Sequence, residues 1–364
     1  MKNTFGNSLS VTIYGESHGN SIGAVIDGIS PGIAVDTEFI KNQLSLRRPA
    51  DLISTSRQEA DEFTIGSGVF RGFTTGTPIL IRIPNADTRS KDYGELEYKM
   101  RPGHADFTAN AKYNGFSDFR GGGHFSGRIT AALVAAAGII IPALNKKGIH
   151  IATHISRCAG VDDAVFSNLE NDIKILNSKH FAVLDDAKGD LMKENILKAK
   201  SMGNSVGGVL ETVVLGMPSG VGEPWFDTME SMLSHALFSI PAIKGVEFGD
   251  GFALTDMLGS DANDEFYYDE SGEVKTHTNH NGGINGGITN GMPLVFRCAV
   301  KPTPTVSLEQ NTIDIKNKEN TTLLAAGRHD PCIVHRARVV VDSVTAITLC
   351  DLLLTKYGTD WLAK

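Results

Sequence analysis

The fold is indicated by two stretches of the chain, GVFRGFTTGTPILIR (68–82) and GINGGITNGMPLVFR (283–297). Aligned without a gap, they share three glycines, a threonine, a proline and an arginine. Each stretch reads as glycine-rich turns followed by a short aliphatic strand, because glycine marks turns and places where backbone approaches a ligand. We interpret the two stretches as an internal duplication; chance similarity between glycine-rich segments is the alternative.

A second pair of segments fits the same interpretation. NSIGAVIDG (20–28) resembles NSVGGVLET (204–212), and each precedes a helix expected to begin at an aspartate N-cap, Asp36 or Asp227. Strands are predicted at 10–15, 23–28, 78–83, 207–216 and 293–300, and helices at 126–141 and 190–201. The pattern predicts one large domain or two fused halves, with a ligand cleft between the halves.

Composition narrows the class of protein. The chain has 364 residues, 41% of them hydrophobic, and a net charge of −8, so it can bury a large core and is not expected to bind nucleic acid. Its four cysteines are scattered without a CxxC pair, which is typical of reduced thiols, and no metal site is expected. No signal-peptide or membrane-length apolar run is visible. We expect a soluble cytoplasmic protein with no membrane partner.

Three segments offer proton chemistry. His18 in GESHGNSIG (15–23) and His104 in RPGHADF (101–107) lie among small residues that leave room for a ligand, and imidazole exchanges a proton near neutral pH. In RHDPC (328–332), Asp330 follows an arginine and a histidine. The structural alternatives are an ordinary ion pair and solvent-exposed histidines.

Other segments suit anions. Arginines stand beside glycine, proline or polar residues, and a guanidinium can bind carboxylate or phosphate through two parallel hydrogen bonds. Three glycines precede a predicted helix start in RGGGHFSGRITAALVAAAG (120–138), and the free amide groups at a helix start favour phosphate. A lysine and two threonines stand in VKPTPTV (300–306). No Walker or GxGxxG motif occurs. The residues predict an enzyme acting on a multiply anionic small molecule, with solvated surface charge as the alternative.

Seven segments, in chain order, resemble the chorismate synthase family: GESHGNSIGAVIDGISPG, RRPADLISTSRQE, TGTPILIRIPNADTRSKDY, RPGHADFTANAKYNGFSDFRGGG, SIPAIKGVEFGDGF, NGGINGGITNGMPLVFRCAVKPTPT and GRHDPCIVHRARVVVDSVTA. The resemblance covers nearly the whole chain. It implies an α+β fold, a β-α-β sandwich with helices between antiparallel sheets and an internal pseudo-twofold duplication. The domain would span 1–364, with similar halves at approximately 1–150 and 200–364, and would form a homotetramer.

The resemblance also implies a reaction. The family converts 5-enolpyruvylshikimate 3-phosphate to chorismate by 1,4-anti elimination of phosphate, in the shikimate pathway of aromatic amino acid biosynthesis. Such a carbon–oxygen lyase requires reduced FMN (FMNH2). NADPH is a candidate reductant, either used directly or through a separate flavin reductase, and we expect dependence on an external reductant. A non-catalytic anion- or flavin-binding homologue and a flavin reductase are the alternatives.

Site residues follow from the same resemblance. His18 would protonate the leaving phosphate, His104 would lie near N1 of the reduced flavin, and Asp330 would assist flavin N5 in removing the C6 proton. Arg47 matches a position for NADPH or substrate anions. The implied FMN contacts are His124, Phe125, Ser126, Pro241, Ala242, Gly286, Lys301, Pro302, Thr303, Pro304, Thr305 and Arg328. The implied substrate contacts are Ser17, Arg48, Arg57, Arg101 and Arg128.

One loop departs from the family pattern. The family reads GGGRSSARET where this chain reads GGGHFSGRIT. His124 therefore replaces an arginine and Phe125 a serine, while Arg128 is kept. The change puts the FMN contacts of this loop in question, and Phe125 could instead stack on a ring.

Overall fold

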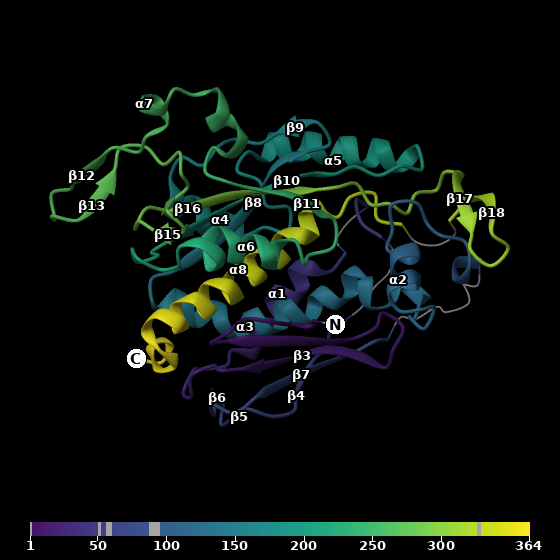
Figure 1. Cartoon of the computed structure of the whole chain (residues 1–364), viewed down its shortest axis with the longest axis horizontal. Helices are drawn as coiled ribbons and strands as arrows, with labels where there is room; N and C mark the ends of the chain where they lie inside the picture. The colour runs from purple at the N-terminus through teal and green to yellow at the C-terminus, as the bar shows by residue number, and fades with distance from the viewer. Residues whose placement is uncertain (1, 50–51, 56–59, 87–94, 326–328) are drawn as a thin grey trace.

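Two antiparallel five-stranded sheets enclose a layer of helices (Figure 1). The computed structural model describes residues 2–49, 52–55, 60–86, 95–325 and 329–364. The first sheet has the order β1 (Thr4–Phe5), β2 (Ser10–Gly15), β3 (Ser21–Asp27), β7 (Ile79–Pro84), β4 (Thr64–Ile65). The second has the order β11 (Ile243–Phe248), β16 (Leu294–Val300), β10 (Gly208–Leu215), β8 (His150–Cys158), β9 (Val161–Asp162).

The helices between the sheets are α1 (Thr37–Arg47), α3 (Thr130–Lys146), α6 (Met229–Leu237) and α8 (Val334–Tyr357). One hydrophobic core takes in buried side chains from both sheets and from all four helices. The sandwich of helices between antiparallel sheets, predicted from the family resemblance, is therefore confirmed, and so is the α+β class.

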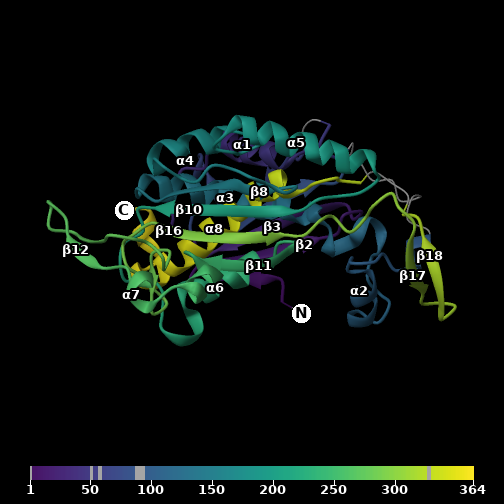
Figure 2. The same cartoon turned by 90° about the horizontal axis from the view of Figure 1, so that it is seen from above.

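Further helices and hairpins surround this sandwich. They are α2 (Asp106–Lys112), α4 (Leu169–Ser178), α5 (Asp186–Ser201), α7 (Gly259–Ala262), and the hairpins β5–β6 (Val69–Phe70, Phe73–Thr74), β12–β13 (Phe266–Tyr268, Val274–Thr276), β14–β15 (Ile284–Asn285, Ile288–Thr289) and β17–β18 (Gln310–Asp314, Glu319–Leu323). Figures 1 and 2 both place α2 beside β17–β18, at the opposite end of the molecule from β12–β13.

The two glycine-rich stretches that opened the sequence analysis form hairpins with the same hydrogen bonds. In each, a threonine hydroxyl accepts a backbone N–H at 2.9 Å and donates to a backbone carbonyl at 2.6 Å. The partners are Ile33 and Ser30 for Thr74, and Val221 and Pro218 for Thr289. The aligned glycines all have positive φ, between 78° and 92°, which explains why glycine occupies both sets of positions.

The second pair of similar segments, 20–28 and 204–212, falls on β3 and on the start of β10. The turn glycines that end β3 and β10 are Gly28 and Gly216, each with positive φ and a backbone carbonyl 2.0 Å from where a Cβ would lie. These two turn glycines are 188 residues apart, whereas the segments NSIGAVIDG and NSVGGVLET are offset by 184. Asp36 caps α1 as predicted, but α6 is capped by Thr228, whose side chain accepts from Ser231, and not by Asp227.

The helix α3 is apolar enough to be mistaken for a membrane span. Among the described residues, Gly127–Lys146 is the segment with that length and hydropathy, and 78% of its apolar 18-residue window is buried. It lies between the sheets, as a core helix does (Figure 1). Gly138 allows α1 to approach closely, because a Cβ there would lie 2.8 Å from Cγ1 of Ile40.

The last helix, α8, is almost entirely buried although it carries polar residues. Ser343, Thr345 and Thr348 each donate a hydroxyl to the carbonyl four residues earlier, at 2.6–2.8 Å, so burial leaves these groups satisfied. Near the other end, the carboxylate of Asp351 accepts the backbone N–H groups of Asn7, Ser8 and Leu9 at 2.7–3.0 Å. The chain's first loop is thus fastened to its last helix.

Candidate active site

A cavity of about 850 Å³ brings together side chains from both halves of the sequence. It includes the three candidates for proton chemistry, His18, His104 and Asp330. The other predicted residues that line it are Arg47, His124, Phe125, Ser126, Arg128, Pro241, Ala242, Lys301, Thr303 and Pro304. Histidines 86 residues apart in the chain therefore share one space.

Several predicted residues do not line this cavity. They are Ser17, Arg48, Arg101, Gly286, Pro302 and Thr305. Ser17 is fully buried, and Gly286 lies in the turn between β14 and β15. Arg48 borders a separate pocket of about 610 Å³ and donates to the carbonyl of Ala60 at 3.4 Å. The predicted residues Arg57 and Arg328 lie outside the described residues.

A turn of three glycines separates the two imidazoles. Gly121, Gly122 and Gly123 all have positive φ, at 59°, 83° and 53°. A Cβ on Gly121 would lie 2.3 Å from Cε1 and Nδ1 of His18, and a Cβ on Gly122 would lie 3.2 Å from Cε1 of His104. The glycines are required both by their φ values and because the rings lie directly against the turn.

The ring of His104 is held at its Nδ1 edge by the ion pair between Asp106 and Arg101. Its Nδ1 lies 2.7 Å from Oδ1 of Asp106, and Arg101 donates Nε and NH2 to the two oxygens of that carboxylate, each at 2.8 Å. Burial pushes the pKa of Asp106 upward, but the hydrogen bonds from Arg101 and His104 outweigh it and hold this pKa far below its usual value. Arg101 therefore binds the carboxylate of Asp106 and does not line the cavity.

A second arginine–carboxylate pair with two hydrogen bonds lies near His18. Arg120 donates Nε and NH2 to the two oxygens of Asp118, each at 2.8 Å. The hydrogen bond from Arg120 is the main reason that the pKa of Asp118 is lowered, and the charge of His18 lowers it further. A carboxylate thus stands near each imidazole.

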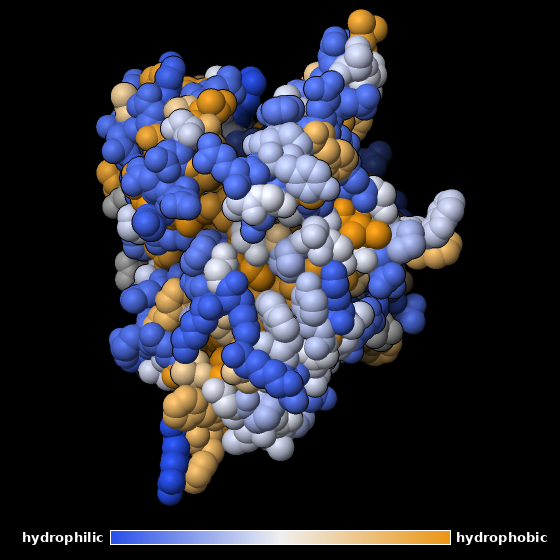
Figure 3. Space-filling model, turned by 90° about the vertical axis from the view of Figure 1, so that its left-hand side faces the viewer, coloured by the Kyte–Doolittle hydropathy of each residue, from blue (hydrophilic) through white to orange (hydrophobic). Residues whose placement is uncertain are grey.

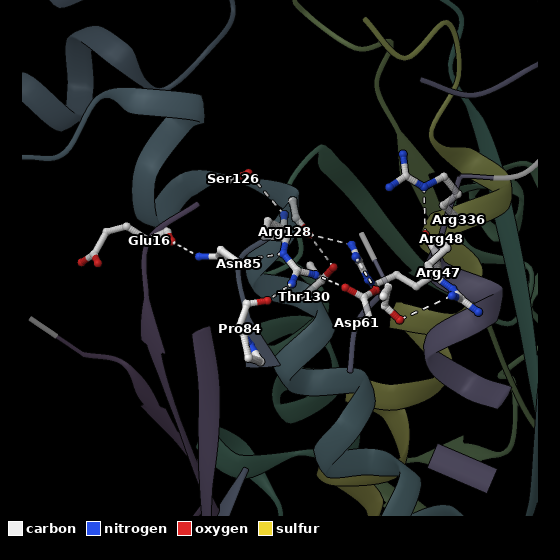
Figure 4. Close-up of polar contacts among 12 residues, drawn as sticks. Glu16, Arg47, Arg48, Asp61, Pro84, Asn85, Ser126, Arg128, Thr130 and Arg336 are labelled. Carbon is white, nitrogen blue, oxygen red and sulfur yellow. Dashed lines mark hydrogen bonds and ion pairs between the residues drawn. The ribbon is translucent and has the colours of Figure 1, made fainter. Parts of the chain in front are cut away.

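The wall of the cavity carries a buried cluster of three charges (Figure 4). Asp61 accepts from Arg47 at 2.9 Å and forms a second ion pair with Arg128; the side chain of Asp61 is fully buried. Burial raises the pKa of Asp61, but the two arginines together outweigh that effect and lower it. Arg128 also donates to Asn85 and to the carbonyl of Pro84, at 3.1 and 3.2 Å, which fixes its guanidinium in place.

Asp330 is fixed by two donors. Its Oδ1 accepts the backbone N–H of Thr55 at 2.8 Å, and its Oδ2 accepts NH1 of Arg336 at 2.7 Å. Arg336 in turn donates Nε to the carbonyl of Arg47 at 2.9 Å, which ties α8 to the end of α1. Burial lowers the pKa of Arg336 and Asp330 opposes that shift.

The cavity is positively charged. Among the described residues that line it, five are cationic, namely Arg47, Arg128, Lys244, Lys301 and Arg336, and one carries a carboxylate, Asp330. Asp61 adds one more negative charge behind this lining. In a chain whose net charge is −8, this local excess is the concentration of arginine and lysine that an anion site requires.

Comparisons with known proteins assign the chain to a family. The family model described as chorismate synthase matches residues 9–354. Proteins named chorismate synthase from Thermococcus kodakarensis and Chitinophaga pinensis are 43% and 46% identical to this chain, over 99% and 100% of it and 99% of each relative. This chain belongs to the chorismate synthase family.

A solved structure supports the same assignment. The protein titled "Crystal Structure of Chorismate Synthase" superposes with a TM-score of 0.77 at 31% identity, covering 98% of this chain and 95% of that one. A chorismate synthase from Synechocystis is 44% identical over 97% of this chain and 98% of the relative. Proteins with this name are lyases of the shikimate pathway.

The loop that departs from the family pattern keeps its place at the cavity. His124 is anchored through Nδ1 to the carbonyl of Gly15 at 2.7 Å, and Ser126 accepts the N–H of Arg128 at 3.3 Å. Phe125 packs edge-on against Tyr113, with ring centroids 6.1 Å apart. All three loop residues line the cavity in this member of the chorismate synthase family.

Sequence reasoning missed three residues that contact candidate site residues. Asp61, Asp106 and Arg336 contact Arg128, His104 and Asp330, respectively. Asp106 stands two residues after His104, so its proximity could have been proposed from RPGHAD. Asp61 and Arg128 are 67 positions apart, and the sequence around either residue does not predict their pairing.

Proposed function

We propose that this chain catalyses the 1,4-anti elimination of phosphate from 5-enolpyruvylshikimate 3-phosphate to give chorismate, with a requirement for reduced FMN. The single observation that carries the proposal is the shared cavity, where His18, His104 and Asp330 face one positively charged space. A substrate with two carboxylates and a phosphate needs such charge compensation.

The chain's own side chains supply the proton chemistry. His18 is the proposed acid that gives a proton to the departing phosphate, while the surrounding cations hold that anion. Asp330 is proposed to assist removal of the C6 proton of the substrate. Its carboxylate is oriented by hydrogen bonds from Thr55 and Arg336. His104 is proposed to hydrogen-bond the flavin, with its free nitrogen set by Asp106.

The size of the cavity and two of its buried polar atoms support a bound flavin beside the substrate. Its volume of about 850 Å³ lies within the range of ligand pockets of roughly 300–1,000 Å³. Two polar atoms of its lining, Nε of Arg47 and Oγ1 of Thr303, are buried and have no hydrogen-bond partner within the described part of the chain. Buried donors of this kind are normally satisfied, so they suit the oxygens of a bound anion or ring. Reduced FMN, when bound, would supply electron density as phosphate departs.

Assembly, location and reductant complete the proposal. A homotetramer is supported by exposed aromatic side chains, which include Trp225, Phe226, Phe252, Phe266 and Tyr268. Figure 3 shows apolar atoms at the surface, among polar ones, at the end of the molecule that carries the C terminus. We propose a cytoplasmic protein that receives reduced flavin from an external source, such as a separate flavin reductase using NADPH.

We also propose that the two halves arose by duplication. Support comes from the matched hairpin bonds of Thr74 and Thr289 and from the equivalent turn glycines Gly28 and Gly216. The halves would extend over approximately 1–150 and 200–364, as the sequence predicted.

The test is turnover under anaerobic conditions. Protein with chemically reduced FMN is mixed with 5-enolpyruvylshikimate 3-phosphate, and released phosphate and chorismate are measured. His18→Ala should keep flavin affinity and lose most turnover, whereas the control His150→Ala, an exposed histidine outside the cavity, should retain it. Flavin binding without phosphate release would instead favour a non-catalytic homologue.

A parallel assay addresses the reductant. The protein is incubated with oxidised FMN and NADPH under anaerobic conditions, without any reductase, and NADPH absorbance is followed. We expect no consumption. Steady oxidation of NADPH would show that the chain reduces its own flavin.

A further inference from the structure

We propose that Asp106 is a positioning residue that fixes the tautomer of His104, so that Nε2 is the nitrogen that this ring offers to a ligand in the cavity. The inference deepens the proposed function and rests on it for the kinetic consequence, but the tautomer itself belongs to the ligand-free protein.

The hydrogen-bonding capacity of the groups around Nδ1 decides the tautomer. A carboxylate only accepts and a guanidinium only donates. Nδ1 lies 2.7 Å from Oδ1 of Asp106 and 3.1 Å from NH2 of Arg101. An unprotonated Nδ1 would place its lone pair against the carboxylate oxygen at the shorter distance. A proton on Nδ1 turns that contact into a charge-assisted hydrogen bond.

Arg101 does not need Nδ1 as an acceptor. Its Nε and NH2 each donate to an oxygen of Asp106 at 2.8 Å, and the backbone N–H of Arg101 reaches Oδ2 at 3.1 Å. The side chains of both members of this pair are less than one-tenth exposed. The carboxylate is therefore held rigidly, and its position fixes the orientation of the ring.

The opposite edge of the ring is left for the cavity. His104 lines the cavity, and a Cβ on Gly122 would lie 3.5 Å from Nε2, so this nitrogen lies beside the glycine turn with no side chain in between. In the neutral ring Nε2 is an acceptor; in the protonated ring it is a donor whose charge Asp106 balances. Either form presents the same atom at the same place.

Substitution by asparagine tests the assignment. A carboxamide can give its oxygen to Arg101 and its NH2 group to Nδ1, which would move the ring proton to Nε2. The same exchange of tautomer explains the large loss of activity when the orienting aspartate of serine-protease triads is changed to asparagine. We expect Asp106→Asn to lower kcat on the order of 10²-fold while KM changes little, because losing one preorganised hydrogen-bonding group at the reacting centre costs about 10²–10³-fold.

The primary readout is the ring's nitrogen spectrum. Ligand-free protein labelled with ¹⁵N-histidine is studied by long-range ¹H–¹⁵N correlation, and His104→Gln identifies the signals of this ring. Wild type should show a protonated Nδ1 and a bare Nε2 when neutral, and Asp106→Asn should show the reverse. Asp118→Asn is the matched control, because Asp118 accepts two hydrogen bonds from Arg120 in the same way and its imidazole neighbour is His18, not His104; it should leave the His104 signals unchanged.

The outcomes separate this inference from the proposed function. An Nε2–H tautomer in the wild type, or an unchanged tautomer in Asp106→Asn, would overturn the role of Asp106 whether or not the protein turns over. The wild-type spectrum decides the point even if the variant fails to fold. Absence of wild-type turnover beside the expected spectra would count against the proposed reaction alone.

Discussion

Replacing Gly121 by alanine tests the contact on which the site geometry depends. The residue has φ of 59°, where an alanine costs about 1–2 kcal/mol. Its Cβ would also lie 2.3 Å from two atoms of the His18 ring, and overpacking of this kind costs about 1–3 kcal/mol. Together, Gly121→Ala should lower the free energy of unfolding by about 2–5 kcal/mol, a large part of the roughly 5–15 kcal/mol that a protein has.

The same loop provides the control. At Gly127 a Cβ would meet nothing within 4 Å and φ is not positive, so Gly127→Ala should change the unfolding free energy by less than about 0.5 kcal/mol. Urea unfolding of both variants, followed by circular dichroism, measures the difference. Gly121→Ala should also displace the His18 ring and reduce turnover. Equal urea midpoints for the two variants would refute the argument that the ring lies against the turn.

Three further predictions concern buried charge. Asp61→Asn leaves Arg47 and Arg128 without their shared carboxylate and should cost about 3–5 kcal/mol of unfolding free energy in urea. Asp351→Ala leaves three backbone N–H groups unsatisfied and should cost about 3 kcal/mol by the same measurement. Burial lowers the pKa of His154, but its carboxylate partners outweigh this and raise it, so the stability that it adds below pH ~6.5 should fade as pH rises through its folded pKa, and His154→Gln should remove that dependence.

Much of the fold was predictable because its signals are local. The strand at 10–15 was predicted with the bounds of β2, and those at 78–83 and 293–300 within one residue of β7 and β16. The hairpin turns need positive φ at fixed positions, and glycine adopts positive φ without strain, so the glycine spacing in the sequence predicts the turns. The helix α8 was not predicted, because its Val- and Thr-rich segment has high strand propensity that burial between two sheets overrides.

The site was predictable in part for a different reason. His18, His104 and Asp330 stand in motifs shared with a family, so their presence in one cavity could be anticipated. The pairing of Arg101 with Asp106, instead of with a ligand, depends on which way a guanidinium points, and residue type does not reveal that direction. Asp61 and Arg336 likewise owe their importance to partners that only folding brings near.

The fastening of the first loop to Asp351 has a consequence for biosynthesis. This carboxylate is separated from the residues of the first loop by 342–344 positions, and it lies on the same helix as the Arg336 that holds Asp330. During synthesis, the first loop therefore lacks this anchor until α8 has left the ribosome. Chaperones that shield unfinished β-sheets would be needed longest for a protein built in this order.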